Sequence, residues 1–475
     1  MAKDFKLYIN GEWIDNGDHD TVTDKYTGEG WATLPRAGER EADQALEAAA
    51  QARQPMREMT ARLRGEILEQ IVVQLKQRER ELAETIAVEA GKSWKYALGE
   101  VKRAQETFTF AADVARTFGG ETVPMDAAAR GKDTLGFWIR EPVGVVLAIT
   151  PFNFPLNLVA HKVAPAIATG CPVVLKPAGT TPITALKLAE ILDSTPLPKG
   201  AYNVVHGSGS KLGKALVPDR RVNKVSFTGS VEVGRWIKQN SDVVRVTLEL
   251  GNNSAVVVDE DANLDDAIPQ CVTGSYANSG QVCIGIQRIY VHGSHFEEFL
   301  ERFVEQSKQQ KIAHPLEEDG DVGPLISEGD VERVQQWVQE ARDGGAKVLS
   351  GGEPVNERIY PPTVLTGTNA DMKVWSDELF APVVIVERVE SFEEGLRLAD
   401  TGDYGLQAGV FTPRIKEALQ AIRGIDVGGI MINGIPTFRV DHMPYGGNKM
   451  SGIGREGVRF AAEEMTSPKM VVIKA

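Results

Sequence analysis

The 475-residue sequence has few cysteines, few histidines and no long apolar run, and each shortage excludes a class of protein. Three cysteines, an odd number, do not suggest a disulfide framework, so we expect a reducing, cytoplasmic setting. The seven histidines are scattered and no Cys or His pair has ligand spacing, so we predict no metal site. Since no uncharged run reaches about 18 residues and no apolar signal region opens the chain, we expect neither a membrane span nor a secretion signal.

Positive charge is also scarce. The chain has 52 Lys and Arg against 66 Asp and Glu, a formal net charge of -14. This field repels nucleic acids and anionic membranes, so we predict neither as a partner. The length and the 42% hydrophobic content indicate an enzyme-sized protein of two or three domains.

Apolar runs without alternation indicate strands that are covered on both faces of a parallel sheet. Two series of such runs occur, with glycine-bearing turns and helix-like segments between them. The first series comprises residues 145–150, 172–175, 202–205 and 224–227, and the second comprises 255–258, 289–291, 383–386, 408–411 and 429–432. The predicted fold class is therefore α/β, with two doubly wound Rossmann-like domains.

Other elements are expected around these two series. Residues 7–14 predict a hairpin around an Asn-Gly turn, and residues 39–118 predict long helices broken near Gln54-Pro55 and near Gly91. Thr181 is expected to cap a helix that has Pro182 in its first turn.

Two strand-like segments, residues 134–140 and 470–473, have no local partner. We therefore predict a small β oligomerisation element, residues 121–140 and 455–475, in a homodimer or homotetramer. The remainder divides into a dinucleotide-binding domain, residues 1–120 and 141–251, and a catalytic domain, residues 252–454.

Three residues are candidates for chemistry. Cys283 follows a Ser-Gly break between a helix and a strand, so its sulfur is either an accessible nucleophile or, as for most free cysteines, a small buried hydrophobe. Glu249, between two leucines at a strand end, is either a base with a raised pKa or an edge-strand side chain facing water. Asn153 is either a turn former or a donor for an oxyanion. Cys171 and Cys271 are interpreted as core.

Two glycine-containing turns follow strands of the first series. Residues 207–213 resemble a dinucleotide fingerprint but have one residue too many before the last glycine. Residues 227–234 fit better, because Ser230 should begin a helix whose free N–H groups favour a pyrophosphate. An ordinary strand-to-helix turn with Ser230 as the cap is the alternative.

Seven segments together resemble the aldehyde dehydrogenase superfamily. They occur in family order over nearly the whole chain: Pro151–Pro155, Lys176–Ala178, Phe227–Ser230, Leu248–Gly251, Gly280–Cys283, Glu378–Val383 and Pro444–Gly452. The resemblance implies NAD(P)-dependent oxidation of a small aldehyde to the acid. The implied route passes through a cysteine thiohemiacetal and a thioester that water hydrolyses.

The resemblance also implies a role for each matching residue. Cys283 corresponds to the nucleophile, Asn153 with the Cys283 backbone N–H to the oxyanion hole, and Glu249 to the base that activates water. Lys176 and Glu378 correspond to residues that hold the cofactor ribose hydroxyls, Phe380 to the ring against the nicotinamide and Ser230 to a pyrophosphate contact. The predicted cofactor site is completed by Thr150, Phe152, Gly179 and Gly229.

The sequence departs from this pattern at informative positions. Gly179 stands where many NAD-using members carry a glutamate, so we expect NADP to be accepted and favoured over NAD. Asn252 replaces a more usual glycine, without an evident reason. Arg439 and His442, on the loop bordering the substrate entrance, predict an anionic or hydroxylated aldehyde, as in lactaldehyde-, phosphonoacetaldehyde- and sulfolactaldehyde-oxidising subgroups. A surface arginine paired with Asp441 is the alternative.

Two other functions remain as alternatives. A CoA-acylating semialdehyde dehydrogenase is disfavoured by Glu249, which such enzymes generally lack. An inactive nucleotide-binding relative is disfavoured because Cys283, Glu249 and Asn153 are all retained.

Overall fold

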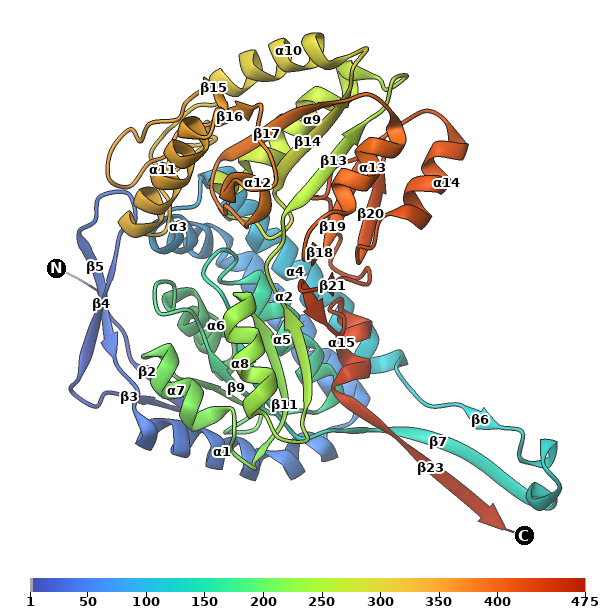
Figure 1. Cartoon of the computed structure of the whole chain (residues 1–475). Helices are drawn as coiled ribbons and strands as arrows, with labels where there is room; N and C mark the ends of the chain where they lie inside the picture. The colour runs from blue at the N-terminus through green and yellow to red at the C-terminus, as the bar shows by residue number, and fades with distance from the viewer. Residues whose placement is uncertain (1–2, 475) are drawn as a thin grey trace.

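The computed structural model describes residues 3–474, which form two α/β lobes and a projecting β arm (Figure 1). The lobes are built on an eight-stranded and a seven-stranded sheet, which confirms the predicted fold class. Residues 1–2 and 475, at the outer ends of the predicted first domain and oligomerisation element, lie outside the described residues.

The first sheet has the order β22-β12-β11-β8-β9-β10-β2-β3. Its five central strands are parallel: β8 (Val145–Ile149), β9 (Val173–Lys176), β10 (Tyr202–Val204), β11 (Val222–Thr228) and β12 (Arg245–Glu249). The predicted hairpin, β2 (Leu7–Ile9) and β3 (Glu12–Ile14), forms one edge. From β8 the chain first adds β9 and β10 on one side and then β11 and β12 on the other. Ligands bind at such a reversal, beyond the carboxyl ends of the strands.

Helices cover both faces of this sheet. They are α1 (Glu39–Glu58), α2 (Ala61–Gln77), α3 (Glu79–Ala90), α4 (Trp94–Thr117), α5 (Asn157–Thr169), α6 (Ile183–Asp193), α7 (Gly209–Leu216) and α8 (Val231–Asn240). The break predicted near Gln54-Pro55 falls slightly later, because α1 continues through Pro55 and ends at Glu58, before α2 begins at Ala61. Pro55 removes one hydrogen bond near a helix end, while the buried neighbours Ala52 and Met56 hold that turn against the core.

The predicted cap of α6 is wrong. Within residues 3–474, Thr181 Oγ1 has no hydrogen-bond partner. Instead, the carboxylate of Glu89, on α3, accepts from the backbone N–H groups of Ile183 (2.8 Å) and Thr184 (2.9 Å). A residue distant in sequence thus satisfies the free donors of the first turn.

The second sheet has the order β15-β16-β17-β14-β13-β19-β20 and is parallel except for the pair of β15 and β16. Its strands are β13 (Ser254–Val258), β14 (Ile286–His292), β15 (Lys347–Ser350), β16 (Thr363–Thr366), β17 (Val383–Val389), β19 (Gln407–Phe411) and β20 (Gly429–Ile432). The accompanying helices are α9 (Leu264–Tyr276), α10 (Phe296–Lys308), α11 (Glu328–Asp343), α12 (Lys373–Ser376), α13 (Phe392–Asp400) and α14 (Ile415–Gly424).

The C-terminal segment connects all parts of the molecule. β21 (Asn448–Lys449) pairs with β18 (Tyr404–Gly405) beside the second lobe, β22 (Gly452–Ile453) closes the first sheet, and α15 (Val458–Glu464) packs on α4 and α5. β23 (Thr466–Lys474) then pairs along its whole length with β7 (Thr134–Pro142), which also pairs with β6 (Thr122–Val123). The two strands without local partners are therefore partners of each other.

A three-stranded sheet of β1 (Lys3–Asp4), β4 (His19–Thr23) and β5 (Gly30–Pro35) flanks the first lobe (Figure 1). Across residues 3–474, no helix combines the length and apolar character that crossing a membrane requires.

Candidate active site

A turn in an unusual backbone conformation presents Cys283. After α9, the residues Asn278, Ser279 and Gly280 all have positive φ, at 52°, 56° and 71°. This conformation costs a non-glycine residue about 1–3 kcal/mol, so other contacts must hold it. The Ser279 hydroxyl donates to the Gly323 carbonyl (3.0 Å) and accepts from the Gly323 N–H (2.9 Å). The turn is thus fixed by a distant segment.

Asn153 joins the first lobe to this turn. Its side chain is 3% exposed, and Nδ2 donates to the Gln281 carbonyl at 3.0 Å. Asn278 Nδ2 donates to the same carbonyl at 3.2 Å. The Asn153 amide is therefore bound to Gln281, which precedes Cys283 by two residues.

The Cys283 sulfur lies 3.0 Å from the hydroxyl of Tyr445. Burial raises the pKa of the thiol to about 11, against the lowering effects of the Tyr445 hydrogen bond and of Arg439. The protein by itself therefore keeps the thiol protonated at neutral pH. A base or an added positive charge is needed to form the thiolate.

Glu249, at the end of β12, is 2% exposed, which excludes the alternative of an edge-strand side chain facing water. Among the described residues neither of its carboxyl oxygens has a hydrogen-bond partner. Burial, followed by the charge of Glu456, raises the pKa of Glu249 well above its usual range, although Arg439 and Lys162 oppose this. A carboxyl group without protein partners is free to bind and deprotonate another molecule.

Sequence reasoning missed a buried ionic network behind this carboxyl. Lys162 Nζ contacts Glu456 Oε1 at 2.6 Å and the Thr228 hydroxyl at 2.7 Å, and Arg439 contacts Glu456 Oε2 at 3.2 Å. Lys162 lies on α5, and the apolar residues around it in the sequence gave no sign of a buried ion pair. Glu456, just after the Gly-rich C-terminal motif, could have been noticed there.

Arg439 is not a surface residue. Its side chain is 6% exposed, and its guanidinium carbon lies 3.6 Å from the centre of the Tyr445 ring. Arg439 Nε has no hydrogen-bond partner within residues 3–474. The suggested partner, Asp441, instead pairs with Arg103 (2.7 Å) and His161 (2.8 Å). Arg439 thus has a free donor near the thiol.

His442 lies elsewhere on the same loop. It is exposed, and its ring centre lies 4.5 Å from that of Phe110 on α4.

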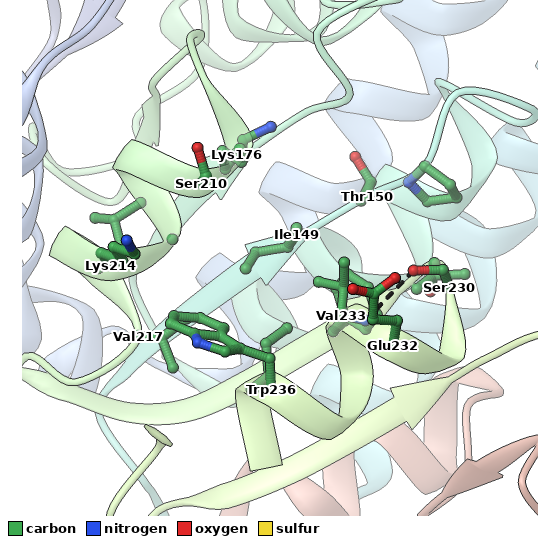
Figure 2. Close-up of a pocket in the computed structure, with 18 residues that line it drawn as sticks. Ile149, Thr150, Lys176, Ser210, Lys214, Val217, Ser230, Glu232, Val233 and Trp236 are labelled. Carbon is green, nitrogen blue, oxygen red and sulfur yellow. Dashed lines mark hydrogen bonds between the residues drawn. The ribbon is translucent and has the colours of Figure 1, made fainter. Parts of the chain in front are cut away.

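A cavity of about 500 Å³ opens where the first sheet reverses its strand order (Figure 2). Four predicted cofactor residues, Thr150, Lys176, Gly229 and Ser230, line it. Ser230 caps α8, and its hydroxyl accepts from the Val233 N–H at 3.4 Å. Ser210 and Val233, from the two glycine-containing turns, also line the cavity, together with Lys214, Val217 and Trp236, which sequence reasoning did not single out.

The lining fits a dinucleotide. The Trp236 ring and neighbouring aliphatic side chains form an apolar wall, and the N-terminus of α8 offers N–H groups to a phosphate (Figure 2). Thr150 Oγ1 is buried without a partner in the described part of the chain. Lys176 Nζ donates to the Pro177 carbonyl at 3.0 Å, and burial lowers its pKa to about 8. A polar ligand would therefore offer new hydrogen-bond partners to Thr150 Oγ1 and Lys176 Nζ.

The other predicted cofactor residues lie outside this cavity lining. The rings of Phe152 and Phe380 meet edge to face, with centres 5.8 Å apart. Glu378 accepts from the Asn252 N–H at 2.9 Å, and burial raises its pKa to about 7. A Cβ added at Gly179 would meet no atom within 4 Å, so this position faces open space.

The structure explains why residue 252 is asparagine and not glycine. Its Nδ2 donates to the Ser254 hydroxyl (2.6 Å) and its Oδ1 accepts from the Leu406 N–H (3.2 Å). A glycine could not tie the connection between the two sheets in this way. In residues 3–474 we find no cluster of three or more His, Cys, Asp or Glu side chains suited to a metal ion.

The fold and these groups define an oxidoreductase that binds a dinucleotide and works through a cysteine. The chain matches the aldehyde dehydrogenase family over residues 13–471 and belongs to that family. It is 42% identical over 473 residues to a 3-sulfolactaldehyde dehydrogenase of Priestia aryabhattai, covering 100% of this chain and 98% of that one.

Two solved structures are similar over nearly their whole length. Aldehyde dehydrogenase 21 from Physcomitrella patens, in complex with the reaction product succinate, has a TM-score of 0.97 and 39% identity, covering 100% and 99% of the two chains. The glyceraldehyde-3-phosphate dehydrogenase GapN of Methanocaldococcus jannaschii, complexed with NADP, has a TM-score of 0.93 and 38% identity, covering 97% and 100%. The predicted activity, NAD(P)-dependent oxidation of an aldehyde, is confirmed at the level of the family.

Proposed function

We propose that Cys283, Asn153 and Glu249 carry out this oxidation. The observation that carries the proposal is the junction of the two lobes. There Asn153 of the first lobe holds the Cys283 turn (Asn153 to Gln281, 3.0 Å), and the Glu249 carboxyl, which has no hydrogen-bond partner among the described residues, acts electrostatically on the thiol. The Cys283 thiolate attacks the aldehyde carbon. Asn153 Nδ2 and the Cys283 backbone N–H donate to the oxyanion that forms. A bound NAD(P)+ would supply the hydride acceptor for the thiohemiacetal carbon, after which Cys283 would hold the acyl group as a thioester.

Glu249 acts in the second half-reaction. Because no protein group occupies its oxygens within the described residues, the carboxylate is free to take a proton from a water molecule that attacks the thioester. Its raised pKa makes it a stronger base than a surface glutamate. Lys162 and Arg439 counteract the burial and keep the ionised form within reach.

The two half-reactions are separated by rapid mixing. Cys283→Ser should abolish reduction of the cofactor, whereas the control Cys271→Ser, which alters a buried core thiol, should retain it. Glu249→Gln should give one rapid turnover per subunit and then a steady rate lower by at least about 10²-fold. Steady turnover in Glu249→Gln at the normal rate would refute the role of Glu249. Stimulation of the unaltered enzyme by coenzyme A would instead favour the CoA-acylating alternative.

We infer that the substrate is a small anionic or hydroxylated aldehyde. Arg439 Nε has no hydrogen-bond partner within residues 3–474, its guanidinium acts electrostatically on the Cys283 thiol, and a guanidinium pairs well with a carboxylate or sulfonate. His442 would act further out, where it is exposed on the same loop. The name of the Priestia relative and the succinate in the Physcomitrella complex support an anionic group.

We infer that NADP is favoured over NAD. Gly179 leaves open space where a glutamate would repel a 2'-phosphate, and the cavity lining includes Lys176 and Ser210, which could bind that phosphate. The NADP bound to the Methanocaldococcus structure supports this inference.

We also propose a homodimer or homotetramer built on the projecting arm. Large apolar side chains are exposed along its two paired strands: Leu135, Ile139, Met470, Val472 and Ile473. A monomer rarely exposes so many apolar side chains together. The arm extends away from the body of the molecule, next to the first lobe, where a second copy could cover it (Figure 1). Three unpaired cysteines accord with the reducing, cytoplasmic compartment that we propose.

A further inference from the structure

The catalytic thiol has a second partner that none of the roles above uses. The Tyr445 hydroxyl lies 3.0 Å from Cys283 Sγ, and the tyrosine is 3% exposed. The phenolic O–H is a better hydrogen-bond donor than a thiol. Once the sulfur is ionised, the thiolate has no proton and can only accept a hydrogen bond. In the reactive state the hydrogen bond therefore runs from Tyr445 to Cys283.

The backbone around Tyr445 fixes this contact. Tyr445 and Glu456 exchange two backbone hydrogen bonds, of 3.1 Å and 2.6 Å. The next residue, Gly446, has φ 158°, and a Cβ there would lie 2.9 Å from Glu249 Oε1. One short segment therefore lies beside both the nucleophile and the base, and its backbone hydrogen bonds fix the position from which the Tyr445 ring reaches Cys283.

A buried cation lies over the same ring. The Arg439 guanidinium carbon is 3.6 Å from the ring centre and is held there by Glu456 at 3.2 Å. A cation over an aromatic face withdraws electron density, which strengthens the hydroxyl as a donor. Burial, and the proximity of Cys283, nevertheless keep the pKa of Tyr445 well above its usual range, so the phenol retains its proton.

We propose that Tyr445 is a further catalytic residue, whose hydroxyl donates a hydrogen bond to the Cys283 sulfur whenever that sulfur carries negative charge. This occurs twice in the cycle. In the attack, a sulfur lone pair forms the C–S bond and the carbonyl π pair moves to oxygen. In hydrolysis, water adds, the C–S bond breaks and its electron pair returns to sulfur. Tyr445 keeps its proton throughout and stabilises the thiolate before the first step and after the second.

This inference rests on the nucleophilic role proposed for Cys283. Besides Tyr445, the groups that act on the titration of this thiol are Arg439, which favours the thiolate, and Glu378 and Glu249, which disfavour it. Replacing Tyr445 by phenylalanine removes only the hydroxyl. The three charged groups stay in place, and so does the aromatic ring beneath Arg439. The hydroxyl is therefore tested separately from its surroundings.

The test is the pH dependence of Cys283 alkylation by iodoacetamide in the cofactor-free enzyme, followed by mass spectrometry of the Cys283 peptide. A hydrogen bond to a charged group is strong enough to shift the thiol midpoint upwards by about one pH unit or more in Tyr445→Phe. Alkylation at neutral pH should then be at least about tenfold slower, with the same limiting rate at high pH. The control is Tyr360→Phe, which removes a buried hydroxyl without a partner in residues 3–474 and should leave the midpoint unchanged.

A second variant covers the case in which Tyr445→Phe does not fold. 3-Fluorotyrosine at position 445 is a more acidic phenol and a stronger donor, so the midpoint should shift downwards. An unchanged midpoint in either variant, with Cys283→Ser inactive, overturns the role of Tyr445 and leaves that of Cys283 intact. Dehydrogenase activity in Cys283→Ser would overturn both.

Discussion

Gly179 offers the sharpest test of cofactor choice. Its Cβ position faces open space, and its φ lies outside the left-handed region that only glycine adopts readily, so Gly179→Glu should fold without strain. The new carboxylate would stand three residues after Lys176, the residue expected to hold the cofactor ribose. There it would repel a 2'-phosphate and accept from a free 2'-hydroxyl.

Coulomb's law gives the size of the effect. Two unit charges about 7 Å apart, in an effective dielectric of about 20, repel by about 2.4 kcal/mol. That energy corresponds to a loss of about 50-fold in kcat/KM for NADP. A charge-assisted hydrogen bond to the ribose of NAD should add a gain of about tenfold, so the NAD/NADP ratio should rise by several hundredfold.

Steady-state kinetics with each cofactor measure this ratio, and Gly179→Gln, similar in size but neutral, is the matched control. The glutamine variant should lose far less NADP activity than the glutamate variant. Equal losses would show that bulk, and not charge, determines the effect. A preference of the unaltered enzyme for NAD of a hundredfold or more would refute the reasoning at its starting point.

Three further predictions concern other parts of the molecule. Arg439→Ala should lower kcat for every aldehyde, because the guanidinium favours the Cys283 thiolate and ionised Glu249, but it should raise KM by about 10- to 100-fold only for an anionic aldehyde, which alone loses a charged hydrogen bond. Equal changes in KM for the two aldehydes would contradict recognition of the substrate by Arg439. The variant Arg439→Lys keeps the positive charge but removes the forked set of donors, so it separates the two contributions. Ile473→Glu should shift the protein to a smaller species in analytical ultracentrifugation, since it adds charge to the exposed apolar arm; the surface control Lys474→Glu should not. Asp441→Asn should lower the free energy of unfolding by about 1–3 kcal/mol, because the partly exposed Arg103 would lose its charged partner.

The Asp441 prediction includes a pH dependence. Burial raises the pKa of this carboxyl, but His161 and Arg103 lower it more, leaving it well below its usual range. A depressed folded-state pKa stabilises the protein above the unfolded value of about 3.9 and ceases to do so as the pH falls through the folded value. Acid unfolding of Asp441→Asn should therefore depend less steeply on pH below about 4 than that of the unaltered protein. Parallel curves would contradict this assignment.

The sequence was sufficient for features set by local patterns. The strands near Val145 and Val256 were recognisable because both faces are buried and apolar residues run without alternation. The Asn10-Gly11 turn was recognisable because both residues have positive φ, as a two-residue hairpin requires.

Features set by distant partners were not recognisable in this way. The cap of α6 is supplied by Glu89 and not by the adjacent Thr181, and the β23 strand pairs with β7, far from it in sequence. In the active site, the resemblance to the aldehyde dehydrogenase superfamily indicated the Cys283 thiol. It did not indicate Tyr445, because an aromatic residue before two glycines has no pattern that reveals a contact with sulfur.

The C-terminal segment has a consequence for how the enzyme is made. Arg439, Tyr445, Glu456 and β22 all follow both sheets in sequence order, yet they complete the surroundings of Glu249 and one edge of the first sheet. A nascent chain can therefore bury its two sheets while Cys283 still lacks its tyrosine and Glu249 its neighbouring charges. The chemistry thus depends on the last part of the chain to be synthesised: until this segment is in position, Cys283 lacks the hydroxyl of Tyr445, and Glu249 lacks the charges of Arg439 and Glu456.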